Sequence, residues 1–225
     1  PYNWVMNQPL IKGVFKRQVG MVDSPLICRN SLVSGLNARG IELATPSVLK
    51  RLTAEERENA VILVQDAFTS YFETQLVLDL SDLLTGLGFH VLVAPFRPNG
   101  KPLHVHGFMS AFKRAAERNA DLLSRLQQSG IPLVGIDPSM TLTYRQEYTT
   151  VLEEGAQAKV QLLQEWLVEH LDRLARFKAD NAQASGFKLL AHCTEKTTAA
   201  PSIRQWQEVF EAAGLSLSVE AVGCC

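Results

Sequence analysis

The sequence predicts an α/β fold of two related strand–helix–strand units, each with a short parallel sheet, joined by a long helix. Three observations support this class. Short apolar runs rich in β-branched residues alternate with segments whose apolar residues recur at helical spacing. The alternation restarts late in the chain with the same order of elements. In both places a glycine, Gly88 or Gly214, ends a helix just before a strand. Units of this kind are Rossmann-like, with parallel strands.

The N-terminal segment, residues 1–57, is predicted to be an arm or linker that contains helices. Residues 7–19 and 47–59 can form helices, whereas residues 20–46 are rich in Gly, Pro, Ser and Asn. Such a composition favours loops over regular elements. We therefore expect an extended segment between the two helical regions.

Residues 58–150 are predicted to form the first unit. Residues 61–64 are a β-branched apolar run of the kind found in buried parallel strands. Pro138 occupies a position typical of the first turn of a helix. The unit is predicted to have strands at residues 61–64, 90–95 and 132–136 and helices at residues 69–87, 108–128 and 138–149.

Residues 151–225 are predicted to form the linking helix and a truncated second unit. The long helix is expected over residues 153–178. The second unit then has strands at 187–192 and 217–222 around a helix at 202–213. The linking helix is predicted from six apolar residues on one helical face: Leu162, Leu163, Trp166, Leu167, Leu171 and Leu174.

Aligning the two units on their glycines predicts which positions correspond. Asp66, at the end of the first strand of the first unit, falls near Cys193. Residues 98–100 fall on Cys224, Cys225 and whatever follows them. The first unit thus has the same scaffold without the thiols, so we expect it to be purely architectural.

The composition excludes several classes of protein. The chain has 225 residues, of which 46% are hydrophobic and 20% charged, and its net charge is −1. It has no basic stripe, so nucleic acid is not an expected partner. No apolar run reaches the roughly 18 residues of a membrane helix, and the first residues have no signal-peptide pattern. We expect a cytoplasmic protein with no membrane span, with peripheral contact at the inner face of the membrane as an alternative.

The two ends of the sequence favour an origin in a longer chain. The sequence begins at Pro1 and stops directly after two cysteines. A native end there would leave reactive thiols on a fraying terminus. We therefore expect both ends to have been cut from a larger protein.

Three of the four cysteines, Cys193, Cys224 and Cys225, lie close together near the end of the sequence. Each follows a predicted strand, and the carboxyl ends of neighbouring parallel strands meet at one edge, where ligands bind. Thiolates bind zinc and iron–sulfur clusters, so these three residues are predicted to be metal or cluster ligands. The alternative is a buried Cys193 and a coincidental pair. Cys28 stands alone and is predicted to be a small buried apolar residue.

The segments around these cysteines resemble a known module. Residues 191–193 (Ala-His-Cys) followed by residues 222–225 (Val-Gly-Cys-Cys) are similar to the cysteine-rich CCG domain of heterodisulfide reductases and glycolate oxidase iron–sulfur subunits. The first unit resembles the same module in residues 65–72 and 137–148. In the family, Cys-Cys-Gly often stands where this chain has Pro-Asn-Gly at residues 98–100, and Cys-Pro-Ser-Cys where it has Asp-Pro-Ser-Met.

Over residues 15–225 the chain resembles the C-terminal part of bacterial FAD-linked oxidases with iron–sulfur domains, of the D-2-hydroxyglutarate dehydrogenase type. The resemblance implies an electron-transfer module in which Cys193, Cys224 and Cys225 hold part of a 4Fe-4S cluster. It implies FAD in an upstream domain outside this chain. The implied partners are the upstream FAD and ferredoxin-like domains of the same polypeptide and an electron acceptor. The implied substrate is a 2-hydroxy acid such as D-2-hydroxyglutarate or a D-lactate-like acid, and this chain alone is expected to be inactive.

Two other functions stay open from the sequence. One is a zinc-binding or metal-free structural or docking domain of the same class of oxidoreductase. The other is a stand-alone hydrolase or transferase that uses Cys193 as its nucleophile, with His192 beside it.

Other polar residues are weaker candidates for a site. Asp66 and Asp137 follow predicted strands and are expected to cap the next helices. His104 and His106 would share one face of an extended segment, but two zinc ligands are too few. Three basic residues could line an anion pocket, although such residues are more often solvated: Arg97, Lys101 and Arg145.

Overall fold

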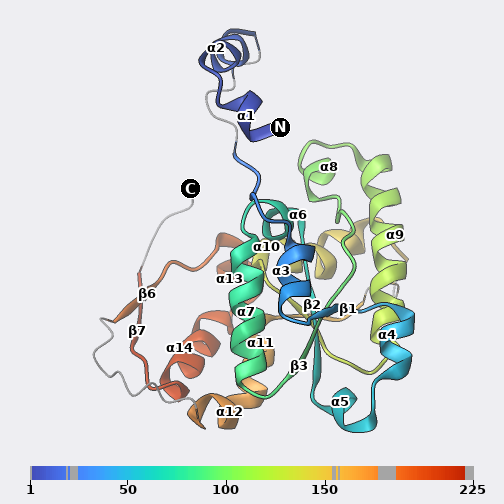
Figure 1. Cartoon of the computed structure of the whole chain (residues 1–225), viewed down its shortest axis with the longest axis vertical. Helices are drawn as coiled ribbons and strands as arrows, with labels where there is room; N and C mark the ends of the chain where they lie inside the picture. Colours follow the sequence, from blue (N-terminus) through green and yellow to red (C-terminus); the bar gives the residue numbers. More distant parts are fainter. Residues whose placement is uncertain are drawn as a thin grey trace.

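Two parallel β-sheets organise the chain (Figure 1). The computed structural model describes residues 2–18, 20, 25–153, 156, 158–176 and 186–220. The larger sheet has five strands in the order β1-β3-β2-β4-β5, and the smaller sheet pairs β6 with β7. Every pairing is parallel, which confirms the predicted α/β class. The strands are β1 (Glu42–Leu43), β2 (Ala60–Val64), β3 (His90–Val93), β4 (Leu133–Gly135), β5 (Val160–Leu162), β6 (Phe187–Leu189) and β7 (Leu217–Val219).

Helices connect the strands and cover the larger sheet on both faces (Figure 1). In the described part of the chain, two 3-10 helices, η1 (Glu147–Thr150) and η2 (Val168–His170), continue or interrupt α-helices. The α-helices are α1 (Tyr2–Met6), α2 (Pro9–Gln18), α3 (Leu32–Ala38), α4 (Pro46–Arg51), α5 (Ala54–Glu58), α6 (Ala67–Tyr71), α7 (Thr74–Gly86), α8 (Lys101–Val105), α9 (Met109–Gln127), α10 (Pro138–Arg145), α11 (Leu163–Leu167), α12 (Leu171–Arg176), α13 (Cys193–Thr198) and α14 (Ser202–Ala212).

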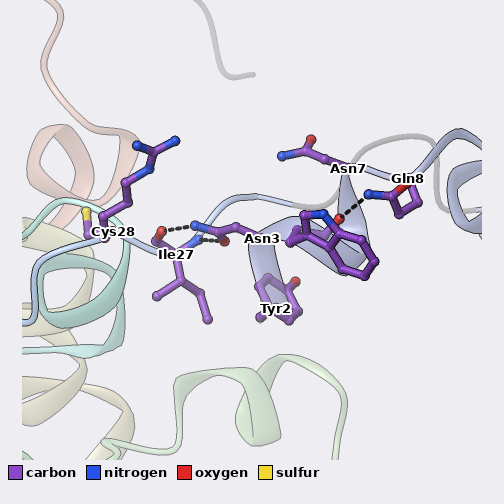
Figure 2. A pocket seen from close by; sticks show the side chains of 8 residues that line it. Tyr2, Asn3, Asn7, Gln8, Ile27 and Cys28 are labelled. Atoms are coloured by element: carbon purple, nitrogen blue, oxygen red, sulfur yellow. Dashed lines mark hydrogen bonds between the residues drawn. The ribbon is translucent and has the colours of Figure 1, made fainter.

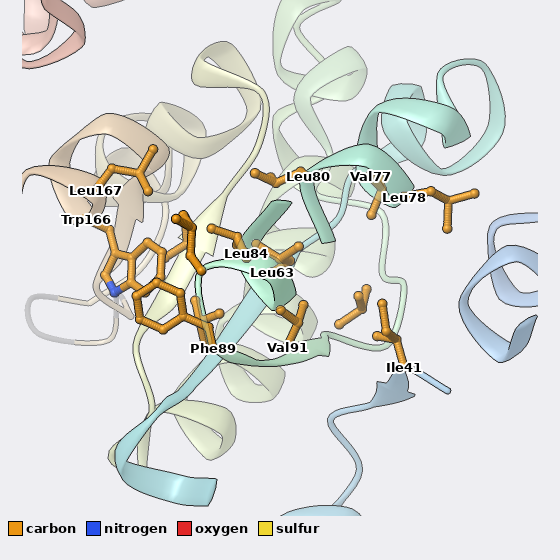
Figure 3. Packing of buried hydrophobic residues seen from close by; sticks show 14 of the residues in the cluster. Ile41, Leu63, Val77, Leu78, Leu80, Leu84, Phe89, Val91, Trp166 and Leu167 are labelled. Atoms are coloured by element: carbon orange, nitrogen blue, oxygen red, sulfur yellow. The ribbon is translucent and has the colours of Figure 1, made fainter. Parts of the chain in front are cut away.

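Strand β2 is the centre of the core, and all of its residues are buried. Successive side chains of a strand point to opposite faces. Leu63 therefore packs with α7 and with Trp166 of α11 on one face (Figure 3), while Ile62 packs with α9 on the other. Each large apolar side chain buried in this way contributes about 1.5–3 kcal/mol. The apolar run at residues 61–64 was thus a sound indicator of the central strand.

The order of the strands creates a switch point between β2 and β4. From β2 the chain moves to β3 on one side, and from β3 it crosses to β4 on the other side of β2. In open α/β sheets, ligands bind outside the carboxyl ends of the two strands where the order reverses. Asp66 and Asp137 lie directly beyond those two ends.

Both aspartates are helix caps, as predicted. The Asp66 carboxylate accepts hydrogen bonds from the backbone amides of Phe68 and Thr69 at the start of α6. The Asp137 carboxylate accepts one from the amide of Met140 at the start of α10. These bonds satisfy amides that have no partner within their own helix.

The predicted long helix over residues 153–178 is wrong. Val160–Leu162 is strand β5, which pairs with β4 and extends the larger sheet. Val160 and Leu162 are both buried while Gln161 between them is not, which is the period-two pattern of a strand. The helical stripe begins only at Leu163 and is divided among α11, η2 and α12. One apolar face runs from strand β5 into helix α11, and its pattern was interpreted as one continuous helix. Residues 177–178 lie outside the described residues.

The segment expected to be an extended arm contains a helix and a strand. Within its described part, residues 32–38 form α3, and β1 pairs with β3 at the edge of the sheet. Ser31 caps α3, and Leu32 and Leu36 are buried in the core. One sheet therefore takes strands from all three predicted segments, and the segment boundaries at 57/58 and 150/151 stay a prediction.

Several helices begin or break at residues that the sequence pattern did not reveal. The helix predicted at 69–87 is divided into α6 and α7. The helix predicted at 138–149 changes to a 3-10 helix at Glu147. The strand predicted at 187–192 ends at Leu189, because His192 already caps α13.

The smaller sheet is held to the larger unit by helix packing. Helix α14 contacts α11 and α12, and Trp206 and Phe210 of α14 pack against the core around β2. Gly88 and Gly214 have positive φ angles of 85° and 75° where α7 and α14 end, so the two units share this glycine cap. Among the described residues, no helix is long and apolar enough to cross a membrane.

Candidate functional site at the carboxyl edge of the sheets

Cys193 is the first residue of α13, directly beyond strand β6. His192 caps the helix through its ring Nδ1, which lies 2.7 Å from Thr194 Oγ1 and 3.3 Å from the Thr194 amide nitrogen. Cys193 is half-buried, and its carbonyl accepts a hydrogen bond from Thr197 Oγ1 at 3.1 Å. Cys193 therefore lies at the first position of a capped helix, after the carboxyl end of a parallel strand.

A buried polar network fixes helix α13 in place. Glu195 Oε1 lies 2.6 Å from Ser202 Oγ and 3.1 Å from Gln164 Nε2, while Glu195 Oε2 accepts from the amide of His192. Gln164 Nε2 also donates to Ser202 Oγ at 2.6 Å. All three side chains are at least 96% buried. The network ties α13 to α11 and α14, so the position of Cys193 is set by the core and not by a loose loop.

Strands β6 and β7 of the smaller sheet each precede a cysteine-bearing segment of the sequence. Strand β6 pairs with β7 in parallel, with Leu189 opposite Val219. Cys193 follows β6, and Cys224 and Cys225 follow β7 in the sequence. Those two cysteines lie outside the described residues, so their convergence with Cys193 stays a prediction.

The first unit brings its corresponding positions together at the switch point. Asn99 Nδ2 lies 3.2 Å from Met140 Sδ. Burial raises the pKa of Asp66, and the charge of Asp137 raises it further, while hydrogen bonds from Thr69 and Phe68 oppose the shift. Asn99, Asp137 and Met140 stand where the resembled module often has cysteines, and Asp66 corresponds to Cys193 of the second unit. Four such positions from three separate segments thus meet at one sheet edge: Asp66, Asn99, Asp137 and Met140.

Two tyrosines that the sequence analysis did not single out close this first-unit cluster. Tyr148 donates from its hydroxyl to the Asn99 carbonyl at 2.8 Å, and its ring packs edge-on against Tyr144. Burial raises the pKa of both phenols, with a further contribution to Tyr144 from the charge of Asp66. Both tyrosines are therefore neutral at physiological pH. The signal available in the sequence was the spacing of four residues between Tyr144 and Tyr148.

The segment with His104 and His106 is expected from the sequence to be extended, but it forms the end of helix α8. His104 lies in α8 and packs on Phe112, with ring centroids 4.8 Å apart. His106 follows α8, and the centroid of its ring lies 6.5 Å from that of the Phe108 ring. Within the part of the chain that the structure describes, no group of three or more His, Cys, Asp or Glu residues could hold a metal ion.

The basic residues are not gathered into an anion pocket. Lys101 forms an ion pair with Glu147, and both side chains are more than four-fifths buried. Arg145 pairs with Glu165 at 2.6 Å.

Cys28 differs from the expected buried apolar residue. It is half-buried, and its thiol lies 2.9 Å from the Phe72 carbonyl oxygen, within hydrogen-bonding distance.

The fold and the site together define an α/β protein whose thiol and polar residues gather at the carboxyl edges of parallel sheets. Along its whole length the chain is similar to curated proteins named D-2-hydroxyglutarate dehydrogenase. It is 48% identical over 224 residues to the one from Pseudomonas putida, 36% over 225 residues to that from Escherichia coli, and 35% over 230 residues to that from Haemophilus influenzae.

The chain spans about a fifth of the length of these relatives, because each alignment covers 100% of this chain and 22% of the relative. The chain therefore aligns with one part of each of these longer proteins. No family model matches the chain. No solved structure matches it either.

Proposed function

We propose that this chain is the iron–sulfur-binding, electron-transfer module of an FAD-dependent 2-hydroxy-acid dehydrogenase that oxidises D-2-hydroxyglutarate or a D-lactate-like acid. The names of the similar proteins support the substrate class. The single observation that carries the cluster site is the parallel pairing of β6 with β7, each of which leads into a cysteine-bearing segment. Cys193, Cys224 and Cys225 are the proposed ligands.

The donor set fits an iron–sulfur cluster in chemistry and in placement. Thiolates are the usual ligands of such clusters, and a 4Fe-4S cluster takes four of them. Cys193 is half-buried at a sheet edge, where a cluster would be reached from outside and still be partly shielded from water. Three thiolates leave one ligand to be supplied by another part of the polypeptide. The cluster would supply one-electron transfer between the flavin and an acceptor.

The first unit supports this placement by analogy within the same chain. Asn99 and Met140, which stand at cysteine positions of the resembled module, approach within 3.2 Å. Asp66 and Asp137 are close enough for the charge of one to raise the pKa of the other. A scaffold of this type therefore brings the corresponding loops together, and we expect the second unit to do the same with its thiols.

A zinc-binding or metal-free docking domain is the second candidate. The observation in its favour is that α13 is fixed by the buried contacts of Glu195 with Gln164 and Ser202. Those contacts fix the start of α13, which includes the Cys193 backbone, through protein groups alone.

Metal analysis of the full-length protein, purified without oxygen, separates the two candidates. The electron-transfer module predicts iron with acid-labile sulfide and broad absorption near roughly 400 nm that weakens in Cys193→Ser. Zinc with no loss of iron in that variant would support the docking domain instead.

Flavin kinetics test whether the proposed cluster carries electrons. In full-length Cys193→Ser, reduction of the flavin by the 2-hydroxy acid should stay within about twofold of wild type, because the flavin domain is elsewhere. Transfer of electrons to an artificial acceptor should slow by about tenfold or more. Equal slowing of both steps would indicate a structural role for Cys193.

A further inference from the structure

The N-terminal arm, defined as α1 and α2 over residues 2–18, has apolar side chains that nothing in the described structure covers. None of the described residues of α1 or α2 is buried. Trp4 is 70% exposed, Leu10 85% and Val14 58%. Figure 1 shows the arm extending away from the rest of the molecule, beyond the edge where α6 and α8 lie. Leu10 and Val14 are four residues apart on α2, so their exposed side chains share one face of the helix. Adjoining exposed apolar side chains of this kind are a feature of interaction surfaces.

The arm is too short to be a stable unit by itself. Its helices have 5 and 10 residues. Isolated helices shorter than about 12–15 residues are marginal in water, and most helical stability in proteins comes from packing of an apolar face. The helices of the arm therefore need a partner that covers Trp4, Leu10 and Val14.

Hydrogen bonds to residues 25–29 orient the arm, and a groove lies between the arm and these residues. The side-chain Nδ2 of Asn3 donates to the backbone carbonyl of Ile27 at 2.6 Å, and the side-chain Oδ1 of Asn3 accepts from the backbone amide of Ile27 at 2.9 Å (Figure 2). The groove between α1 and this segment has a volume of about 640 Å³ and is lined by Trp4, Gln8, Ile27 and Arg29, among others. It is large enough to receive an apolar side chain or a short segment.

We propose that the arm and its groove form the docking surface for another part of the same polypeptide. The relatives of this chain are more than four times its length, so most of the polypeptide lies outside the structure. Trp and Arg are enriched among the few residues that contribute most of the binding energy between partners, and the groove is lined by Trp4 and Arg29. The arm carries Lys12, Lys16 and Arg17 and no acidic residue, so the surface that receives it should be acidic at its rim. This proposal does not depend on a metal.

Hydrogen exchange on the full-length protein tests the docking. Arm amides should exchange at least about tenfold more slowly than their intrinsic rates. Leu10→Asp and, separately, Val14→Asp should return them to about those rates while β2 stays protected. Leu76→Asp is the matched control, since Leu76 is a half-exposed leucine on α7 outside the arm. It should leave arm exchange unchanged.

Three results would overturn the proposal. The first is exchange of the arm at intrinsic rates in the wild-type full-length protein. The second is protection that survives both aspartate substitutions. The third is protection that grows between about 1 and about 50 μM protein, since concentration dependence would identify a second copy of the chain as the occupant. Iron content is measured on the same samples, so a failure of the cluster assignment is distinguished from a failure of the docking.

Discussion

At the scale of single residues, Asp66 combines a favourable cap with an unfavourable burial. Its carboxylate accepts two backbone hydrogen bonds at the start of α6 and is 97% buried. Burial, with a smaller contribution from Asp137, raises its pKa above the ordinary value. The charged form is therefore disfavoured in the folded state, although the cap itself stabilises the helix.

Asp66→Asn keeps a good capping group and removes the charge. Because the folded pKa of Asp66 is raised, its stabilising contribution is present at low pH and is lost as pH rises through the folded pKa. The unfolding free energy of wild type minus that of Asp66→Asn should therefore increase as pH falls from about 7 to about 4. Urea unfolding at each pH measures this difference. A difference that shrinks on acidification would mean that the hydrogen bonds, and not burial, control the group.

The residues of the proposed site were only partly accessible to sequence reasoning. Asp66 and Asp137 were predicted as caps because a polar residue after a strand has a local explanation. The contact between Asn99 and Met140 was not predicted, since it joins positions 41 residues apart. The placement of Cys193 at a helix start was missed because the strand before it ends three residues early.

At the scale of elements, the position of α13 depends on contacts between three helices. Glu195 of α13, Gln164 of α11 and Ser202 of α14 share one buried network. A buried network of this kind is strong when complete and costly when one member is removed. No local pattern in the sequence predicts it, because its members come from helices that meet only in the folded chain.

Removing the centre of this network should loosen the site. Glu195→Ala leaves the polar groups of Gln164 and Ser202 without this partner, and should lower the unfolding free energy by about 2–3 kcal/mol. It should also speed alkylation of Cys193. The control is Glu208→Ala on α14, whose ion pair with Arg204 is exposed and should contribute no more than about 0.5 kcal/mol. Equal losses in the two variants would contradict the role given to the network.

The failure over residues 153–178 also belongs to the scale of elements. Leu162 and Leu163 are adjacent, so one apolar stripe can run from a strand into a helix. Pairing of Val160 and Leu162 with β4 is a long-range contact, and it overrides the helical pattern. The strand at 60–64 was predictable because a continuous apolar run needs no partner to be recognised.

At the scale of the whole molecule, residues 32–43 of the N-terminal segment belong to the core of the larger sheet. Strand β1 pairs with β3, and α3 packs against α7. Leu36 is 99% buried, although its segment has the composition of a loop. Composition alone could not predict this, because the burial of α3 comes from a helix far away in sequence.

Leu36→Ala should therefore behave as a core substitution. Truncating a buried leucine leaves a cavity and should lower the unfolding free energy by about 2–4 kcal/mol. Val33→Ala is the control in the same helix, since Val33 is 51% exposed and should lose less than about 1 kcal/mol. Denaturant unfolding of both variants measures the difference. If Leu36→Ala left the unfolding free energy unchanged, residues 32–43 would be a linker and not part of the core.

We propose that Cys193 holds a cluster at the carboxyl edge of the second sheet. The most direct measurement is iron and acid-labile sulfide per chain in the full-length protein purified without oxygen, for wild type and Cys193→Ser, with Cys28→Ser as the matched control. We expect a loss of about four iron and four sulfide per chain in Cys193→Ser, because one 4Fe-4S cluster is lost, and no loss in Cys28→Ser. Equal iron and sulfide in all three proteins would contradict it.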